Sequence, residues 1–543
     1  MEGGEGRVAF NGGRHAEGGE AVESREGVVG TAGESLRGGE LVEVTRRVGA
    51  ERQGGRVGVA GGGEVFTLVG GFGGATESGV RLGGLSGRRR EGEKERTGEG
   101  PRTKDQGPRI KEQGARTKDQ GPRTKLVGRG SKLAKREWQI VIEAVRMNSP
   151  PNILWIVTTQ WRAQACGYAG DPNARTPHLD AWAAQSVNYT QAVTPHPFGP
   201  FARAALLTGI PSPENGVRDY FDPLPRNART IAHDLGEDGY RTAFFGKWHL
   251  AEKPNDVPLV GEAHARLRVA EGARGGFAHW QGFEGGFQLN DPWLHGTGID
   301  EPRRFFGYQS DVVCERAAAW LVSAKGSPAF CVVSLEPPHP PYDAPAAGVA
   351  PRDPAEMRLP ANVPAAAEAK ARKELSGYHA HLEATDRAIG RLLEKIDPDR
   401  CAVVFTSVHG DMHGAHGLFR KGWPHEESVR VPLLVRSPGL GARRDRGALS
   451  LVDLPEITRG LAAGKRPEIN RRHARISMPS VVALPQQCDR VWRGVRTAER
   501  KLVLGPEGAP WLLFDLERDL LEQANLAEDP ARAAEIERLR SFC

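Results

Sequence analysis

Apolar residues gather into short, dense runs only in the second part of the chain, from about Met147 onward. Runs of this length, bounded by polar residues, predict buried strands at Ile153–Val157, Thr242–Phe245, Phe330–Leu335, Ala402–Thr406 and Leu433–Val435. Between them, helical spacing predicts helices at Thr176–Gln185, Arg203–Leu207, Thr230–Glu237 and Lys370–Ile396. This alternation is typical of an α/β domain with a largely parallel sheet covered on both faces, predicted for residues 147–480.

The end of the chain has a different pattern. Lys501–Leu504 and Trp511–Asp515 read as antiparallel strands, and Asp529–Leu539 reads as an amphipathic helix. We therefore expect a small C-terminal α+β subdomain over residues 481–543.

Residues 1–146 show no lasting period of either strand or helix, and they hold 35 of the 69 glycines of the chain. From Gly100 a seven-residue repeat of the type G-P-R-T-K-D-Q follows. A coiled coil is excluded, because the repeat lacks apolar a and d positions and places glycine, usually with proline, in each turn. We predict a disordered extension that acts as a solvated linker, or upstream DNA translated before a start at Met147. The alternative is a basic tail for nucleic acid or membrane.

The formal net charge of +6 falls entirely in residues 1–146, while the remainder holds 47 basic and 47 acidic residues. The basic pI therefore predicts no nucleic-acid-binding face on the globular part. The six cysteines show no C-x-x-C spacing, and no apolar run approaches the length of a spanning helix. No signal peptide follows either candidate start, so we expect a reducing, cytoplasmic setting without membrane contact.

Several ordered blocks of the second part resemble those of one enzyme family. They are P-N-I-L-W-I-V-T-T-Q-W-R at 151–162, T-P-H-L-D at 176–180, R-A-A-L-L-T-G at 203–209, F-G-K-W-H-L at 245–250, the block beginning S-V-H-G-D-M-H-G at 407, and L-F-D-L-E-R-D at 513–519. The chain resembles the sulfatases of the alkaline-phosphatase superfamily, which are arylsulfatase-like hydrolases of sulfuric esters. The resemblance implies an alkaline-phosphatase-like sheet flanked by helices.

One position departs sharply from that resemblance. In the family, a cysteine in a C-x-P-S-R segment is oxidised to formylglycine and supplies the nucleophile. Here Gly199 stands at that position, and Arg203 alone of the five residues matches. No Ser, Thr or Cys lies between Phe198 and Ala205, so no neighbour can replace the nucleophile. We expect a catalytically impaired or inactive protein, a pseudoenzyme.

The family also implies calcium or magnesium, held chiefly by carboxylates. The matching positions carry Thr159, Gln160, Val408 and His409, so both expected aspartates are absent. We predict no metal at this place and no other cofactor. A rebuilt transition-metal site is an alternative, suggested by His409, Asp411, His413, His416 and His425.

Other polar residues match the positions that hold sulfate oxygens in the family: Arg203, Lys247, His249, His339 and Lys421. The resemblance implies a cationic pocket for a small sulfate or phosphate ester, aided by the N-terminus of a helix that starts near Ala202. The alternative is that these residues are inherited without a role or are kept for buried hydrogen bonds.

Three functions stay open: a non-catalytic anion-binding homologue, an active sulfate- or phosphate-ester hydrolase with a non-standard metal or water site, and a scaffold or homo-oligomer subunit. Substrate specificity is expected in the loops of Val257–Asp300, whose aromatic residues either line a pocket or cover the core, with the core as the favoured interpretation. They are Trp280, Phe283, Phe287 and Trp293.

Overall fold

The computed structural model describes residues 56–58, 67–69, 150–254, 256–323, 327–467, 471–481 and 487–543. The chain divides into two compact units, Met1–Arg123 and Thr124–Cys543. In the first unit, the described residues form one antiparallel pair, β1 (Arg56–Gly58) with β2 (Thr67–Val69), which the prediction of disorder did not include. The rest of that prediction lies outside the described residues.

A ten-stranded sheet forms the centre of the second unit, in the order β13-β4-β12-β11-β3-β10-β6-β7-β8-β9. Its strands are β3 (Asn152–Thr158), β4 (Val187–Tyr189), β6 (Arg241–Lys247), β7 (His279–Phe283), β8 (Trp293–Gly296), β9 (Ile299–Arg304), β10 (Ala329–Ser334), β11 (Cys401–Ser407), β12 (Leu433–Arg436) and β13 (Arg443–Asp445). The five strands from β11 to β7 are all parallel. β12, β8 and β9 add antiparallel flanks.

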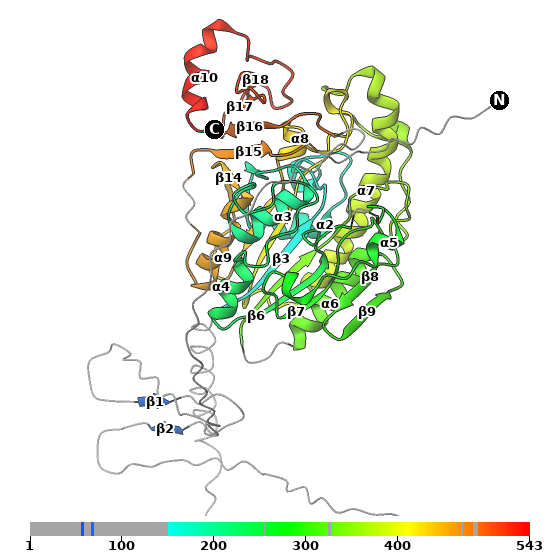
Figure 1. The fold of residues 1–543 in the computed structure, drawn as a ribbon, viewed down its shortest axis with the longest axis vertical. Coiled ribbons are helices and arrows are strands. Elements are labelled where there is room, and N and C mark those ends of the chain that lie inside the picture. Colours follow the sequence, from blue (N-terminus) through cyan, green and yellow to red (C-terminus); the bar gives the residue numbers. More distant parts are fainter. Residues whose placement is uncertain are drawn as a thin grey trace, which may run out of the picture. The chain divides into compact units, whose positions relative to one another are not determined.

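Helices cover both faces of this sheet (Figure 1). One layer holds α3 (Gly199–Thr208), α4 (Ile231–Glu237) and α9 (Leu454–Ala462), and the other holds α2 (Pro177–Ala183), α6 (Gln309–Ser323) and α7 (Ala365–Leu393). Successive side chains of a strand point to opposite faces, and β3 shows the result. Ile153 and Trp155 join one hydrophobic core, whereas Leu154 and Ile156 join the other. The mixed, mostly parallel sheet predicted for this domain is confirmed.

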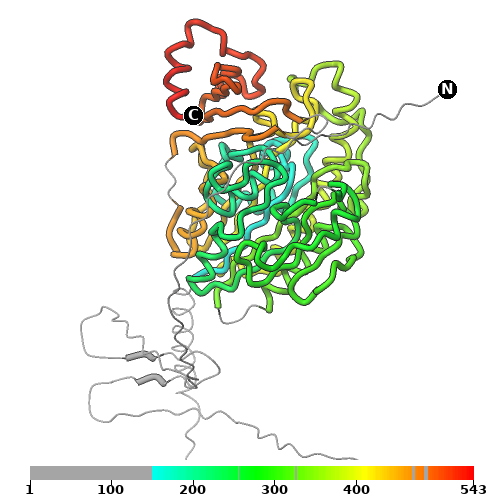
Figure 2. Tube along the Cα trace, in the orientation of Figure 1, coloured from blue at the N-terminus to red at the C-terminus, as the bar shows by residue number. Residues whose placement is uncertain are grey.

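A second, four-stranded antiparallel sheet closes the chain, drawn in orange and red in Figure 2. It contains β15 (Ala474–Met478), β16 (Trp492–Arg496), β17 (Arg500–Leu504) and β18 (Pro510–Asp515), and α10 (Ala533–Arg540) packs on β16 and β17. Leu502, Leu513 and Leu539 form a small core of their own. The sheet lies beside α8 (Glu426–Val429) of the main domain. The predicted C-terminal strands and helix are thus present.

The remaining elements are short. They are β5 (Ala192–Val193) paired with β14 (Leu449–Ser450), α5 (Glu262–Ala265), and the 3₁₀ helices η1 (Gly167–Ala169), η2 (Glu271–Ala273), η3 (Pro354–Glu356), η4 (Ala415–Gly417), η5 (Leu451–Asp453) and η6 (Pro530–Arg532). Among the described helices, none combines the length and apolarity needed to cross a bilayer.

Candidate functional site

The candidate residues gather where adjacent parallel strands end. Ligands of open α/β sheets bind beyond the carboxyl ends of the strands. In sheet order these ends carry Val408 and His409 after β11, Thr159 and Gln160 after β3, His339 after β10, and Lys247 and His249 at the end of β6. Lys421 reaches the group from the loop before α8. Residues far apart in the sequence are thus brought to one edge.

Gly199 is the first residue of α3, three residues before the predicted start of that helix. A Cβ atom built on Gly199 would lie 2.7 Å from His249 Nδ1 and 3.0 Å from His249 Cε1. The ring of His249 is buried and lies 3.3 Å from the Tyr220 hydroxyl through Nε2. Its backbone has a φ of 60°, which is uncommon for a residue with a Cβ. Position 199 therefore has no side chain, and adding one would require the His249 ring to shift.

Arg203, on the same helix, is 4% exposed and hydrogen-bonded only to uncharged groups. Its guanidinium donates to the Lys247 carbonyl (3.2 Å), Ser334 Oγ (2.6 Å) and Thr159 Oγ1 (2.8 Å). Nε is buried without a partner, and in the described ranges no carboxylate oxygen lies within 4.0 Å of the guanidinium. Burial lowers the pKa of Arg203 to about 10, so the group stays charged at neutral pH.

The charge of the Lys247 ammonium, by contrast, is balanced by a buried carboxylate of the protein itself. Its Nζ lies 2.5 Å from Glu336 Oε1, and both side chains are almost fully buried. The other carboxylate oxygen accepts from Gln309 Nε2 at 3.3 Å. Burial lowers the pKa of Lys247, while Glu336 acts in the opposite direction. Sequence reasoning missed Glu336, although a glutamate directly after a buried strand and three residues before His339 was a usable signal.

Lys421 and His339 form a second contact across the site. Lys421 Nζ lies 3.0 Å from His339 Nε2 and donates to Gln160 Oε1 at 2.8 Å. His339 Nδ1 faces the Pro340 carbonyl at 2.8 Å, which fits a proton on Nδ1 and a lone pair on Nε2. Burial, and next the charge of Lys247, lower the pKa of Lys421 to about 7. Burial and the charge of Lys421 lower the pKa of His339 well below its ordinary value.

The four positions of the family metal do not fit a hard divalent cation, which needs several oxygen ligands. Thr159 Oγ1 already accepts from Arg203 and donates to the Leu335 carbonyl at 3.0 Å. Gln160 Oε1 accepts from the Lys421 ammonium, and Val408 is an apolar core residue. His409 offers only a buried Nε2 without a partner, because its Nδ1 faces the Gly410 carbonyl at 2.8 Å.

The Asp411 carboxylate contacts this group through Gln160, and it is enclosed by donors. The Tyr342 hydroxyl donates to Oδ2 at 2.6 Å, and Gln160 Nε2 donates to the same oxygen at 2.5 Å. The amides of His413 and Arg420 donate to Oδ1 at 3.1 and 2.9 Å. Burial alone would raise the pKa of Asp411, but these neighbours hold it well below the ordinary value. Asp411 therefore positions Gln160 and the loop.

The histidines considered for a rebuilt metal site do not share one location with Asp411. His413 Nε2 lies 3.9 Å from Asp411 Oδ2, whereas the His416 ring lies against that of His425, with ring centroids 4.4 Å apart and the planes tilted by 30°. Within the part of the chain that the structure describes, the group able to surround an ion contains His416 with two glutamates instead. The hypothesis of a rebuilt transition-metal site therefore named the wrong set of ligands, apart from His416.

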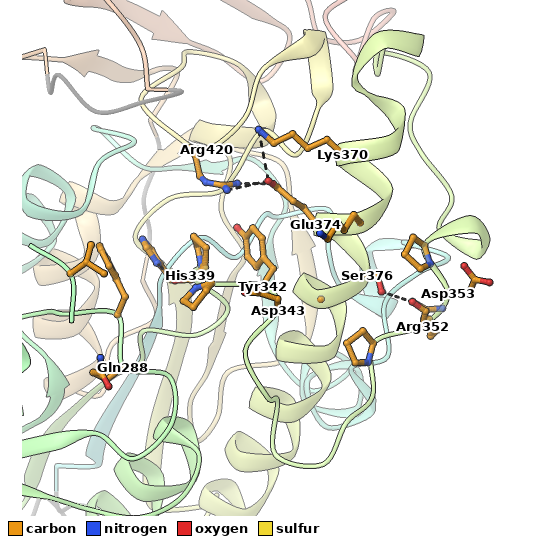
Figure 3. A pocket seen from close by; sticks show the side chains of 18 of the residues that line it. Gln288, His339, Tyr342, Asp343, Arg352, Asp353, Lys370, Glu374, Ser376 and Arg420 are labelled. Carbon is orange, nitrogen blue, oxygen red and sulfur yellow. Dashed lines mark hydrogen bonds and ion pairs between the residues drawn. The ribbon is translucent and has the colours of Figure 1, made fainter. Parts of the chain in front are cut away.

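A cavity of about 1160 Å³ adjoins the site (Figure 3). Its wall includes Phe287, His339, Tyr342, Lys370, Glu374 and Arg420. Phe287 stacks on His339 with centroids 4.5 Å apart, and its ring centroid lies 5.0 Å from Lys247 Nζ. The ring thus separates the cavity from the buried lysine. Trp280 and Phe283 are core residues, as the favoured interpretation expected, whereas Phe287 is part of this wall and follows the alternative of a pocket-lining residue.

Residues 151–462 match the family model described as Sulfatase, which is more than half of the chain. The chain belongs to the sulfatase family. This sulfatase-family protein is 32% identical over 415 residues to the Ulvan-active sulfatase of Formosa agariphila, covering 70% of the chain and 78% of that relative. It is 25% identical over 467 residues to an arylsulfatase of Clostridium perfringens, covering 72% and 93%. The predicted family is confirmed.

Solved structures show the same fold. A Bacteroides thetaiotaomicron structure described under the metabolism of multiple glycosaminoglycans superimposes with a TM-score of 0.64 at 22% identity. The match covers 73% of this chain and 96% of the other. This similarity supports the alkaline-phosphatase-like architecture predicted for the main domain.

Proposed function

We propose that this sulfatase-family protein binds a small sulfate or phosphate ester without hydrolysing it. The observation that carries the proposal is the pair Gly199 and His249, because the imidazole stands where the family's nucleophile would need its side chain. A nucleophile must be present and within reach of its ester before any activating group can act.

The anion-binding half of the proposal depends on buried charge. Removing one partner of a buried ion pair is strongly destabilising, because the remaining charge is left without compensation. Among the described residues, Arg203 has no ion-pair partner, and Lys421 hydrogen-bonds to the neutral groups of Gln160 and His339. The N-terminus of α3 adds a positive dipole end at Gly199, and no side chain caps it. A dianion between these groups would compensate both cations.

We further propose that no calcium takes part. The Lys421 ammonium binds Gln160 Oε1 and the Arg203 guanidinium binds Thr159 Oγ1, so cations already use the oxygens of the family positions.

The six cysteines are free, which supports the reducing, cytoplasmic setting expected from the sequence.

The ligand class follows from the cavity and the relatives. A volume of about 1160 Å³ accommodates a ligand larger than a bare anion. One relative is named for activity on ulvan, so ulvan fragments are suitable first ligands besides inorganic sulfate. The anionic group would lie on Arg203 and Lys421, neither of which lines the cavity, so the Phe287 ring would have to move for the remainder of the ligand to occupy it.

Isothermal titration of the full chain with sulfate, phosphate and ulvan fragments tests the proposal, together with an assay of aryl sulfate and phosphate monoester turnover. We expect binding of an anion, no turnover, and at least tenfold weaker binding by Arg203→Met. Arg316→Met, a partly buried arginine on α6 that contacts Gln281, serves as the control and should bind as the parent does. Turnover that Arg203→Met abolishes would favour a hydrolase, and absence of all binding would favour a scaffold.

A further inference from the structure

A second buried polar cluster lies where the C-terminal sheet meets the main domain, apart from the anion site. Four chain segments supply it: Asn362 before α7, His416 in η4, Glu427 in α8, and Glu522 in the turn after β18. All except His416 are at least nine-tenths buried, and His416 is half-buried. Sequence reasoning included only His416 among possible metal ligands.

Hydrogen-bond acceptors outnumber donors at the centre of this cluster. Asn362 Nδ2 lies 3.2 Å from His416 Nε2, 2.8 Å from Glu427 Oε1 and 3.1 Å from the Leu521 carbonyl. An amide nitrogen carries two hydrogens, so it cannot satisfy three acceptors. Glu427 Oε2 and Asn362 Oδ1 are also buried, and neither has a hydrogen-bond partner. Buried acceptors in surplus call for a cation or a further donor.

The positively charged side chains around this cluster form ion pairs with Glu426 and Glu522. Glu426 lies within about 3 Å of Lys501 and two arginines, at 3.0 Å from Lys501 Nζ, 3.1 Å from Arg496 and 3.0 Å from Arg430. Glu522 lies 2.5 Å from Lys501 Nζ. For Glu427, by contrast, no Lys, Arg or His nitrogen among the described residues lies within 4.0 Å. Glu427 is therefore a buried carboxylate without an ion-pair partner within 4.0 Å in the described part of the chain.

One nitrogen and two carboxylate groups here are close enough to share an ion. Ligand atoms of His416, Glu427 and Glu522 all lie within 4.8 Å of one another. In a tetrahedral zinc site with bonds of about 2.0–2.2 Å, neighbouring ligand atoms are roughly 3.3 Å apart. Modest side-chain movement would close the difference. Rotation of the Asn362 amide would turn Oδ1 toward the same point as a fourth ligand, since the two amide orientations differ only in which atom faces inward.

We propose that His416, Glu427 and Glu522 bind one divalent transition-metal ion of the zinc class, with Asn362 as the fourth ligand. An imidazole ligand favours zinc over calcium or magnesium, which prefer oxygen alone. Because the ligands come from the main domain and from the segment after β18, the ion joins the C-terminal sheet to the main domain. Lys501 keeps its contacts with both Glu426 and Glu522 Oε1, and Glu522 Oε2 also accepts from the Glu426 amide at 2.8 Å, so Lys501 limits the charge that the two ligand glutamates present. The proposal does not depend on the anion site.

The test uses the full chain, stripped with a chelator and dialysed against zinc, with metal content measured by mass spectrometry. We expect one zinc per chain, loss of that zinc in His416→Ala and Glu427→Gln, and retention in His473→Ala, a half-buried histidine elsewhere in the chain. Zinc should raise the Tm of the parent by roughly 3 °C or more and leave the Tm of His416→Ala unchanged.

An anomalous difference map at the zinc edge from crystals of the parent chain gives the location without any variant. A peak among His416, Glu427 and Glu522 supports the proposal even if a variant fails to fold. Absence of stoichiometric zinc, zinc retained at full level by His416→Ala, or a peak at another place such as His409 would each overturn it.

Discussion

His249 Nδ1 lies 2.7 Å from the point that a Cβ atom on Gly199 would occupy, so the imidazole fills the position of the missing side chain. A side chain at position 199 and the present orientation of the His249 ring therefore exclude one another. Restoring the side chain must therefore move the ring.

Gly199→Ala should lower the free energy of unfolding by about 1–3 kcal/mol, because an inserted methyl group overpacks a buried contact. The higher helix propensity of alanine opposes this by at most about 1 kcal/mol. Urea denaturation measures the change. In the background of His249→Gly, which removes the ring and suits the positive φ, the same substitution should cost at least about 1 kcal/mol less. An equal cost in both backgrounds would show that the ring does not restrict position 199.

Gly199→Cys should leave the protein inactive toward aryl sulfates, even when it is produced together with the enzyme that oxidises the family cysteine. The oxidised side chain would meet His249, and Thr159 and Val408 offer no carboxylate for the cation that polarises the ester. Turnover is measured with a chromogenic aryl sulfate, and mass spectrometry checks the oxidation state of residue 199. Turnover by fully oxidised protein would contradict the argument.

Sulfate affinity should fall as the pH rises from 6 to 8, by up to about tenfold per unit above the pKa of Lys421. That pKa is lowered to about 7, so the ammonium is present below this pH and is lost above it, while sulfate keeps its charge. Arg203, with a pKa of about 10, stays charged throughout the range. Titration calorimetry at several pH values measures the slope.

Lys421→Met is the matched variant for this pH series. It should bind sulfate more weakly at pH 6 and show a flat profile between pH 6 and 8. An unchanged slope in Lys421→Met would assign the pH dependence to another group.

Calcium at millimolar concentration should leave the Tm of the parent protein unchanged, because Thr159 and Gln160 already bond to Arg203 and Lys421. The double variant Thr159→Asp/Val408→Asp should unfold at a lower temperature without calcium, since Val408→Asp places an unpaired carboxylate in the apolar core, whereas Thr159→Asp would meet the Arg203 guanidinium. Calcium should restore part of that loss. Differential scanning fluorimetry with and without a chelator makes the comparison. A calcium-induced rise in the Tm of the parent protein would contradict the conclusion that Thr159, Gln160, Val408 and His409 do not hold calcium.

The sequence allowed the buried strands to be predicted well, because strands covered on both faces are continuous apolar runs. β9 could not be read in this way, since Ile299–Arg304 is a largely exposed edge strand of sequence I-D-E-P-R-R. The positions of Arg203 and Lys247 came from the family resemblance. Their partners did not, because the ion pair of Lys247 with Glu336 depends on tertiary geometry across two adjacent strands.

The orientation of the His249 ring could not be predicted from the sequence either. It depends on a left-handed backbone conformation that no local pattern announces. Likewise, Phe287 was expected in the core because aromatic residues are usually buried, yet its stacking on His339 places it in the cavity wall.

Both hydrophobic cores of the main domain are built from strand interiors and helix faces, such as the alternating side chains of β3. The departures at Thr159, Gly199 and Val408 all lie beyond a strand end or at a helix start. Most residues of the candidate site therefore lie outside the residues that build these cores, although Val408 belongs to one of them. A lineage could exchange one reaction for simple recognition, or recover it, while the architecture that carries the site persists.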